Sequence, residues 1–283
     1  MVEREWRIDA GLARDLAAAL GWSGDRGPAA LAELLPQRVP TGSTAKLASM
    51  AAGEVPPGDD PEALARQLLE HLEVRAARSP GGAPSPSWSC WVVSTVMAAL
   101  VDHAELGPVR VVATRRIDEG APLVDLHAEV VVVVDGETWV CDPYFGVGLV
   151  APTGAGVAGE VHVGPCAAWL QHDGEHGWAL AVRLDHWRAP LRYRVLGPSL
   201  DRGDVRAMAE ISTTHTGVPA RPYARLHLDG DAVDVFADDS GHGRFVRHPH
   251  QPPAEGDPPM GETLPTWEDA VEAFAAHTGT RIT

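Results

Sequence analysis

The sequence has no long hydrophobic run and little positive charge, and each deficit excludes a class of protein. No stretch of about 18 consecutive apolar residues occurs, which argues against a membrane-spanning helix. Residues 1–16 lack the uninterrupted apolar segment that an export signal needs, so we expect a cytoplasmic protein. The 23 Lys and Arg residues face 39 Asp and Glu residues, and the formal charge of −16 repels both phosphate backbones and anionic lipid. We therefore expect neither nucleic acid nor a membrane as a partner.

Cysteine is also scarce. Cys90, Cys141 and Cys166 are too few, and odd in number, for a disulfide framework, so we expect free thiols in a reducing compartment. No Gly-rich phosphate loop stands between a predicted strand and a helix, which argues against nucleotide chemistry. The abundance of Ala, Gly, Pro, Arg, Asp and Val is typical of a GC-rich bacterial genome.

The 13 histidines do not form a metal-binding pattern. The motif HDGEH at 172–176 places two histidines four residues apart, but Gly174 and Gly177 argue against a helix that presents both on one face. The motif HPH at 248–250 lies in a Pro-rich stretch without further ligands. We expect no metal site.

What the sequence does contain is a helical first third. Apolar residues recur at helical spacing over 9–20, 28–35 and 61–77, and Asp9 and Asp60 are placed to cap two of these helices. Proline and glycine in 78–87 then predict a loop.

Strands dominate the remainder of the chain. Valine-rich and aromatic segments with strand spacing lie at 109–114, 124–134, 138–142, 191–196, 223–228 and 232–237, before a closing helix at 266–277. This order predicts an α+β fold: an N-terminal helical bundle, a central helix packed on an antiparallel β-sheet or barrel, and a smaller C-terminal α/β portion. We expect the boundaries 1–84, 85–198 and 199–283.

The dipeptide Asp135-Gly136 predicts a tight hairpin between two of these strands. A two-residue loop pairs Val134 with Glu137, and this pair fixes the register of both strands. Side chains alternate between the two faces of a strand, so the register decides which residues of the hairpin share a face.

This register brings several polar side chains together. It sets Glu129 opposite Asp142 and His127 opposite Tyr144, so that His127, Glu129 and Asp142 share one face. Asp142 is then a diagonal neighbour of His127 within reach of a hydrogen bond. Cys141 points to the opposite face, and we expect it to be a packing residue, as we do for Cys166.

Cys90 lies in the segment SWSCWVVSTVMAAL, residues 87–100, which is apolar on most faces as a buried central helix is. Ser87 or Ser89 is a suitable N-cap, which places Cys90 in the first turn of this helix. Unpaired amides and the positive end of the helix dipole favour a thiolate there. A histidine oriented by a carboxylate would complete an arrangement for covalent acyl transfer.

The residues from 85 to 148 resemble the arylamine N-acetyltransferases within the transglutaminase-like, papain-related superfamily. The resemblance rests on SWSCWVVSTVMAALVDHAELGPVRVVA and LHAEVVVVVDGETWVCDPYFG, where DPYFG matches the family's Asp-x-x-Phe-Gly. It implies Cys90 as nucleophile, His127 as base and Asp142 as the orienting acid. The family's Arg-Gly-Gly-Tyr-Cys is replaced here by SPSWSC.

The function implied is that of a cysteine acyltransferase that takes an acyl group from a thioester and passes it to a small-molecule amine or similar acceptor. Coenzyme A and the phosphopantetheine of an acyl carrier protein both remain open as donor, and we expect no bound cofactor. Trp88 and Tyr144 are candidates for lining the substrate pocket. Two alternatives remain: a transglutaminase-like or papain-like peptidase or amidase with the same triad, and a non-catalytic binding module.

Overall fold

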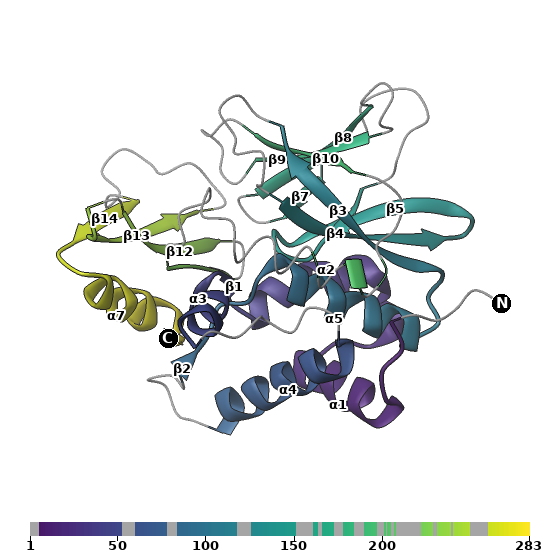
Figure 1. The fold of residues 1–283 in the computed structure, drawn as a ribbon, viewed down its shortest axis with the longest axis horizontal. Coiled ribbons are helices and arrows are strands. Elements are labelled where there is room, and N and C mark those ends of the chain that lie inside the picture. Colours follow the sequence, from purple (N-terminus) through teal and green to yellow (C-terminus); the bar gives the residue numbers. More distant parts are fainter. Residues whose placement is uncertain are drawn as a thin grey trace.

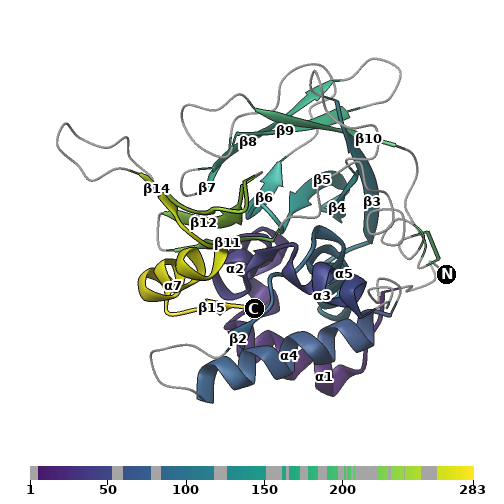
Figure 2. The same cartoon turned by 60° about the vertical axis from the view of Figure 1, so that its left-hand side comes forward.

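The protein is described by a computed structural model. The residues that it describes are 6–52, 60–77, 84–117, 126–150, 161–163, 166–172, 178–183, 190–196, 201, 203–204, 207, 222–228, 231–238, 240–249 and 260–283. Figures 1 and 2 show three parts, namely a base of helices, a strongly curved sheet above it, and a small sheet with one helix beside both. The predicted α+β fold is thus confirmed.

Most helices of the base start near the predicted residues, and the two predicted N-caps are present. Its elements are α1 (Ala10–Leu20), η1 (Gly24–Arg26), α2 (Gly27–Arg38), α3 (Thr44–Ala51), α4 (Pro61–Ala77) and the central α5 (Cys90–His103). The carboxylate of Asp9 accepts hydrogen bonds from the first-turn amides of α1. Asp60 does the same for α4. The short helix α3 was not predicted.

Helix α5 is enclosed by the rest of the fold. All its residues from Cys90 to Val101 are buried, because α1, α2 and α4 contact it from one side and strands of the curved sheet from the other. This double coverage explains why its sequence is apolar on most faces. The nucleophile candidate therefore stands at the end of a helix that packing holds in place.

The curved sheet has eight strands, all paired antiparallel. Its edge strands contact each other, so the sheet is nearly a closed barrel. In chain order the strands are β3 (Val109–Arg116), β4 (Leu126–Val134), β5 (Glu137–Asp142), β6 (Val147–Val150), β7 (Val161–Val163), β8 (Cys166–His172), β9 (Trp178–Arg183) and β10 (Leu191–Val195).

The predicted hairpin register is confirmed. Val134 pairs with Glu137, and the ladder continues to Val130 and Cys141. Both turn residues have positive φ, 54° at Asp135 and 83° at Gly136, which is the conformation of a type I′ turn.

The small sheet joins distant parts of the chain. It orders β1 (Thr41–Gly42), β11 (Tyr223–His227), β12 (Ala232–Ala237), β13 (Gly243–His248) and β14 (Gly261–Leu264), with α7 (Trp267–Thr278) packed on β12 and β13. A separate parallel pair links β2 (Pro84–Ser85) to β15 (Arg281–Ile282), so part of the predicted loop over 78–87 is a short strand. The division at residues 84 and 198 stays a prediction.

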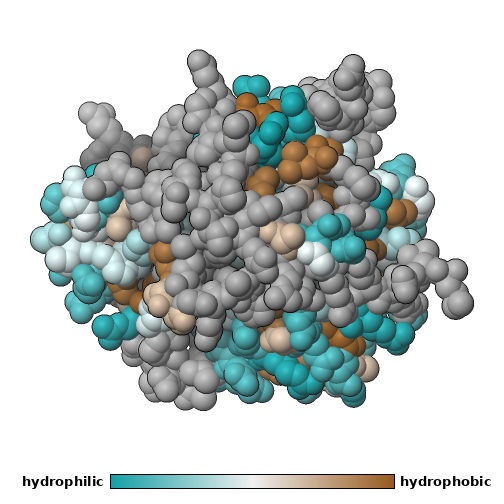
Figure 3. Space-filling view, viewed as in Figure 1, coloured by the Kyte–Doolittle hydropathy of each residue, from teal (hydrophilic) through white to brown (hydrophobic). Residues whose placement is uncertain are grey.

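The outer face of the helical base is mainly hydrophilic. On the face that Figure 3 shows, teal side chains predominate over the lower part of the molecule, and both brown and teal groups lie over the curved sheet. Across the described ranges, no helix is both long and apolar enough to cross a membrane.

Candidate active site

Cys90 is the first residue of α5, which agrees with its predicted place in the first turn of this helix. Ser89 occupies the N-cap position, but its side chain makes no capping hydrogen bond. The hydroxyl of Ser87, the other predicted cap, instead donates to the carbonyl oxygen of Tyr223 at 2.8 Å. Neither of these serine side chains therefore caps the first turn beside the Cys90 thiol, and the positive end of the helix dipole there can stabilise negative charge.

His127 is buried at the start of β4, and a carboxylate fixes its ring. Its Nε2 lies 2.7 Å from Oδ2 of Asp142. The rings of Tyr144, Phe145 and Tyr193 surround the imidazole, with centroids 5.5, 5.2 and 4.8 Å away. The hydrogen bond to Asp142 leaves Nδ1 as the ring nitrogen available to Cys90.

Asp142 is fully buried and held from two sides. Oδ1 accepts hydrogen bonds from the backbone amides of Tyr144 at 3.0 Å and Phe145 at 3.2 Å, while Oδ2 faces His127. The turn continues through Gly146 at φ 73°, where an added Cβ would lie 3.0 Å from the ring of His227. A residue with a side chain would not fit at Gly146. The turn that contains Gly146 orients the carboxylate of Asp142 toward the imidazole of His127.

Electrostatics favour a charged imidazole. Burial alone would lower the pKa of His127, but the negative charges of Asp142 and Cys90, and the hydrogen bonds that the imidazole makes with both, raise it well above its ordinary value. The structure thus brings Cys90, His127 and Asp142 together. Their catalytic roles remain predictions.

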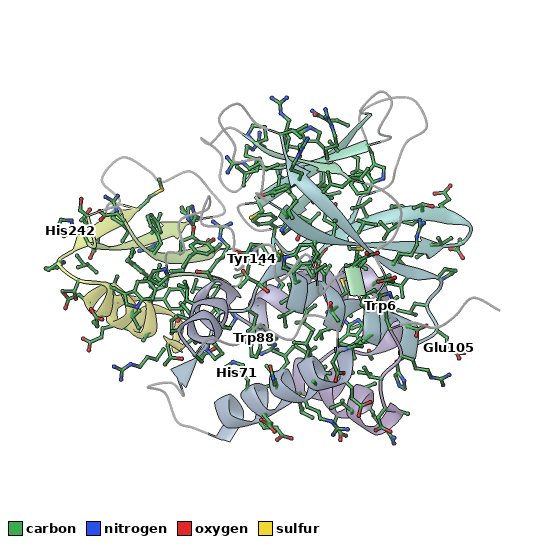
Figure 4. The ribbon with its side chains drawn as sticks, in the orientation of Figure 1. Trp6, His71, Trp88, Glu105, Tyr144 and His242 are labelled. Carbon is green, nitrogen blue, oxygen red and sulfur yellow. The ribbon has the colours of Figure 1, made fainter. Side chains whose placement is uncertain are left out.

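The two pocket candidates lie in different surroundings. The ring of Tyr144 packs edge-on against His127, and burial, together with neighbouring phenols and Cys90, raises the pKa of its hydroxyl. Figure 4 places Tyr144 where the helices and the two sheets meet, and Trp88 lower, beside α4. Trp88 is buried in the helical core against the ring of His71, so its packing does not support substrate contact, which stays a prediction.

The other two cysteines are also buried, away from the start of α5. Cys141 has no exposed surface and packs in the core shared with α5, and burial and then Asp142 raise the pKa of its thiol. Cys166 lies 3.8 Å from Nη1 of Arg225. Both placements agree with packing roles.

A buried glutamate adjoins the predicted triad. Glu129 has no exposed surface, and its Oε1 accepts a hydrogen bond from the Thr114 hydroxyl at 3.2 Å. Burial, and next the charge of Asp142, raise the pKa of Glu129 to about 8. The register had already placed Glu129 on the face of His127, but its burial depends on the closure of the barrel, which the sequence does not reveal.

The donor atoms of His127, Glu129 and Asp142 lie within 4.8 Å of one another, close enough for a metal ion. Both oxygens of Asp142 already accept hydrogen bonds, so we interpret the group as a hydrogen-bonded set. The motif at 172–176 lies largely outside the described residues, and Nε2 of His248 in the second motif donates to Oδ2 of Asp234 at 2.9 Å.

A second buried polar cluster was not predicted. Arg225 makes a bidentate ion pair with Asp234, which also accepts a hydrogen bond from His248. Tyr223 and His227 lie beside this group. The alternating pattern Tyr-x-Arg-x-His in β11 gives these three side chains one face, and this period was the available signal. The cluster joins the small sheet to the turn after Asp142, because His227 packs on that turn.

Comparison with known proteins establishes the fold. No protein-family model matches the sequence, and no curated protein matches it. The arylamine N-acetyltransferase of Salmonella typhimurium superposes with a TM-score of 0.69 at 16% identity over 96% of this chain and 92% of that one. An arylamine N-acetyltransferase of Bacillus cereus, described as having a unique Cys-His-Glu catalytic triad, gives 0.65 at 14% identity over 99% of both chains.

A third structure, the arylamine N-acetyltransferase of Mycobacterium marinum in complex with CoA, gives a TM-score of 0.61 at 16% identity over 89% of this chain and 84% of that one. The chain therefore has the fold of the arylamine N-acetyltransferases, as the sequence resemblance implies.

Proposed function

We propose that the chain is a cysteine acyltransferase that forms an acyl-Cys90 thioester and transfers the acyl group to an amine. The observation that carries this proposal is the position of Cys90 at the first turn of α5 beside an imidazole whose Nε2 bonds to Asp142. The shared fold supports it, because the structural neighbours are N-acetyltransferases.

The first half-reaction acylates the enzyme. The Cys90 thiolate attacks the carbonyl carbon of the thioester, and the first-turn amides of α5 stabilise the oxyanion. The bond from that carbon to the donor sulfur then breaks, and the His127 imidazolium gives its proton to the departing thiolate. The raised pKa of His127 supplies the charged form that this step needs.

The second half-reaction releases the product. The amine attacks the acyl-Cys90 carbonyl, neutral His127 accepts the proton that the nitrogen loses, and the thiolate of Cys90 departs. Asp142 keeps the imidazole in one orientation and stabilises its cation throughout. Three aromatic rings around His127 favour a planar, apolar amine as acceptor.

For the donor we propose a coenzyme A ester. The CoA complex of the Mycobacterium marinum neighbour supports this choice. We place the reaction in the cytoplasm, where the three free cysteines would stay reduced.

The test is intact-protein mass spectrometry after incubation with a panel of acyl-coenzyme A esters, followed by addition of aniline. We expect one acyl adduct on the wild type and on Cys166→Ala, no adduct on Cys90→Ala, and an anilide as product. Release to free acid at a rate that aniline does not change would instead identify a hydrolase. A lack of any adduct would contradict acyl transfer.

A further inference from the structure

Burial of the Glu129 side chain is energetically unfavourable. Its carboxyl group has no exposed surface on β4, and strands β3 and β5 flank it. Apolar residues share the same face of the sheet, among them Val112, its direct partner on β3, and Val131. Burying a carboxylate without compensation is strongly unfavourable, because the charge loses its hydration, so a position that served packing alone would hold an apolar side chain.

Two carboxyl groups in one buried site cannot both ionise easily. Asp142 is the better anion of the two, since it accepts three hydrogen bonds, two from backbone amides and one from His127. Glu129 accepts one, from the Thr114 hydroxyl, and its Oε2 has no hydrogen-bond partner among the described atoms. Glu129 is therefore the group that keeps a proton.

The groups around Glu129 give the direction of its effect. Asp142 on β5 raises its pKa, while His127 on its own strand and the Thr114 hydroxyl on β3 lower it. Arg116 follows Thr114 on the same face of β3, and Tyr193 of β10 pairs with Arg116 and contacts His127. The last charged group is Cys90, which interacts with the imidazole of His127.

We propose that Glu129 is a positioning residue of the Cys90–His127–Asp142 set: its neutral form leaves Asp142 as the single carboxylate facing His127, and its ionisation slows acyl transfer. The inference rests on the proposed function. An ionised Glu129 would add a second carboxylate charge beside the imidazolium. His127 would then hold its proton more firmly and deliver it more slowly to the departing thiolate of the donor.

The test compares the pH profile of single-turnover acylation by acetyl-coenzyme A in four proteins. In the wild type we expect the rate to fall above an ionisation near pH 8, the value to which burial raises the pKa of Glu129. Glu129→Gln should lose this fall, because an amide does not ionise. Thr114→Val should move it to higher pH, because the hydroxyl that stabilises the carboxylate is gone.

Glu33→Gln is the matched control. Glu33 is a partly buried glutamate of α2 whose pKa is also raised by burial, but it lies outside the predicted triad. It should keep the wild-type profile. A Glu129→Gln profile that runs parallel to that of the wild type at every pH would overturn the proposal, because a purely structural role lowers the rate without moving the ionisation.

A second measurement separates this inference from the proposed function. If the wild type forms no acyl-enzyme, the proposed function fails, but the protonation of Glu129 still affects unfolding. Because its folded pKa lies above the unfolded one, stability falls as pH rises from about 4.5 through 8. The midpoint temperature of the wild type should therefore drop relative to Glu129→Gln over this range, and equal slopes would refute a neutral Glu129.

Discussion

The hydroxyl of Ser94 donates a hydrogen bond of 2.9 Å to the carbonyl oxygen of Ala128. Ser94 lies one turn after Cys90 on α5, and Ala128 directly follows His127 on β4. This bond therefore ties the helix of the candidate nucleophile to the strand of its candidate base, inside a region without solvent access.

The first prediction removes that tie. Ser94→Ala should lower the free energy of unfolding by about 1–2 kcal/mol, because the Ala128 carbonyl loses a buried partner. Acylation should slow by about tenfold as the distance between Cys90 and His127 relaxes. Thr95→Val is the control, since the buried Thr95 hydroxyl has no hydrogen-bond partner among the described residues. Equal losses in both variants, measured by chemical unfolding and single-turnover kinetics, would argue against the tie.

The second prediction concerns thiol reactivity. Iodoacetamide at neutral pH should modify Cys90 before Cys141 or Cys166, because Cys90 combines a helix N-terminus with an imidazole partner. Burial and the charge of Asp142 hold Cys141 in its unreactive thiol form. Peptide mapping at partial modification measures the order. Earlier labelling of Cys141 or Cys166 would sink the assignment of the nucleophile.

The third prediction tests the orienting acid. Asp142→Asn should fold, because the amide oxygen can still accept from the amides of Tyr144 and Phe145. The amide nitrogen would face Nε2 of His127 and impose the wrong tautomer, so acyl-enzyme formation should fall by about 10²–10⁴-fold. Circular dichroism checks the fold, and intact mass follows the acyl-enzyme. Near-normal acylation in a folded variant would contradict the role.

The fourth prediction addresses the donor. We expect acyl thioesters of a short pantetheine mimic to acylate Cys90 within about tenfold of the matching coenzyme A ester, or roughly 1.4 kcal/mol of transition-state binding. The reason is the acidic composition, which offers little attraction to the additional phosphates of coenzyme A. Single-turnover rates with the two donors decide the matter. A far larger advantage for coenzyme A would reveal a dedicated nucleotide site.

The fifth prediction is acid sensitivity. Burial, and then the charge of Arg225, lower the pKa of His227 to about 3, so the unfolded chain binds a proton that the folded chain rejects. Stability is therefore lost as pH falls from about 6.5 toward 3, by up to about 1.4 kcal/mol per pH unit. His227→Gln should flatten this slope in urea unfolding. His242→Gln, which alters an exposed imidazole, should leave it unchanged.

Local signals predicted the part of the site that lies within one hairpin. A type I′ turn at Asp135 and a side-chain period of two suffice to bring His127 and Asp142 onto one face. Tyr193 could not be assigned in this way, because it reaches His127 from β10 through closure of the barrel. The buried charge cluster around Arg225 was not predicted for the same reason, since its burial comes from packing between distant segments.

The segment that leads into Cys90, residues 84–88, is hydrogen-bonded to residues distant in the sequence. Gly42 and Thr41 of β1 pair with both Trp88 and β11, where an added Cβ on Gly42 would lie 2.0 Å from the carbonyl oxygen of Tyr223. The pair of β2 with β15 adds residues 281–282 to the same support.

During synthesis on the ribosome, β11 and β15 emerge long after Cys90 has left the exit tunnel. Helix α5 can form early, but the backbone that leads into it acquires its last hydrogen bonds when residues 281–282 arrive. A nascent chain halted before β11 would therefore carry all three candidate catalytic residues and still lack the frame that aligns them. The surroundings of the Cys90 thiol are therefore completed only after residues 281–282 have been made.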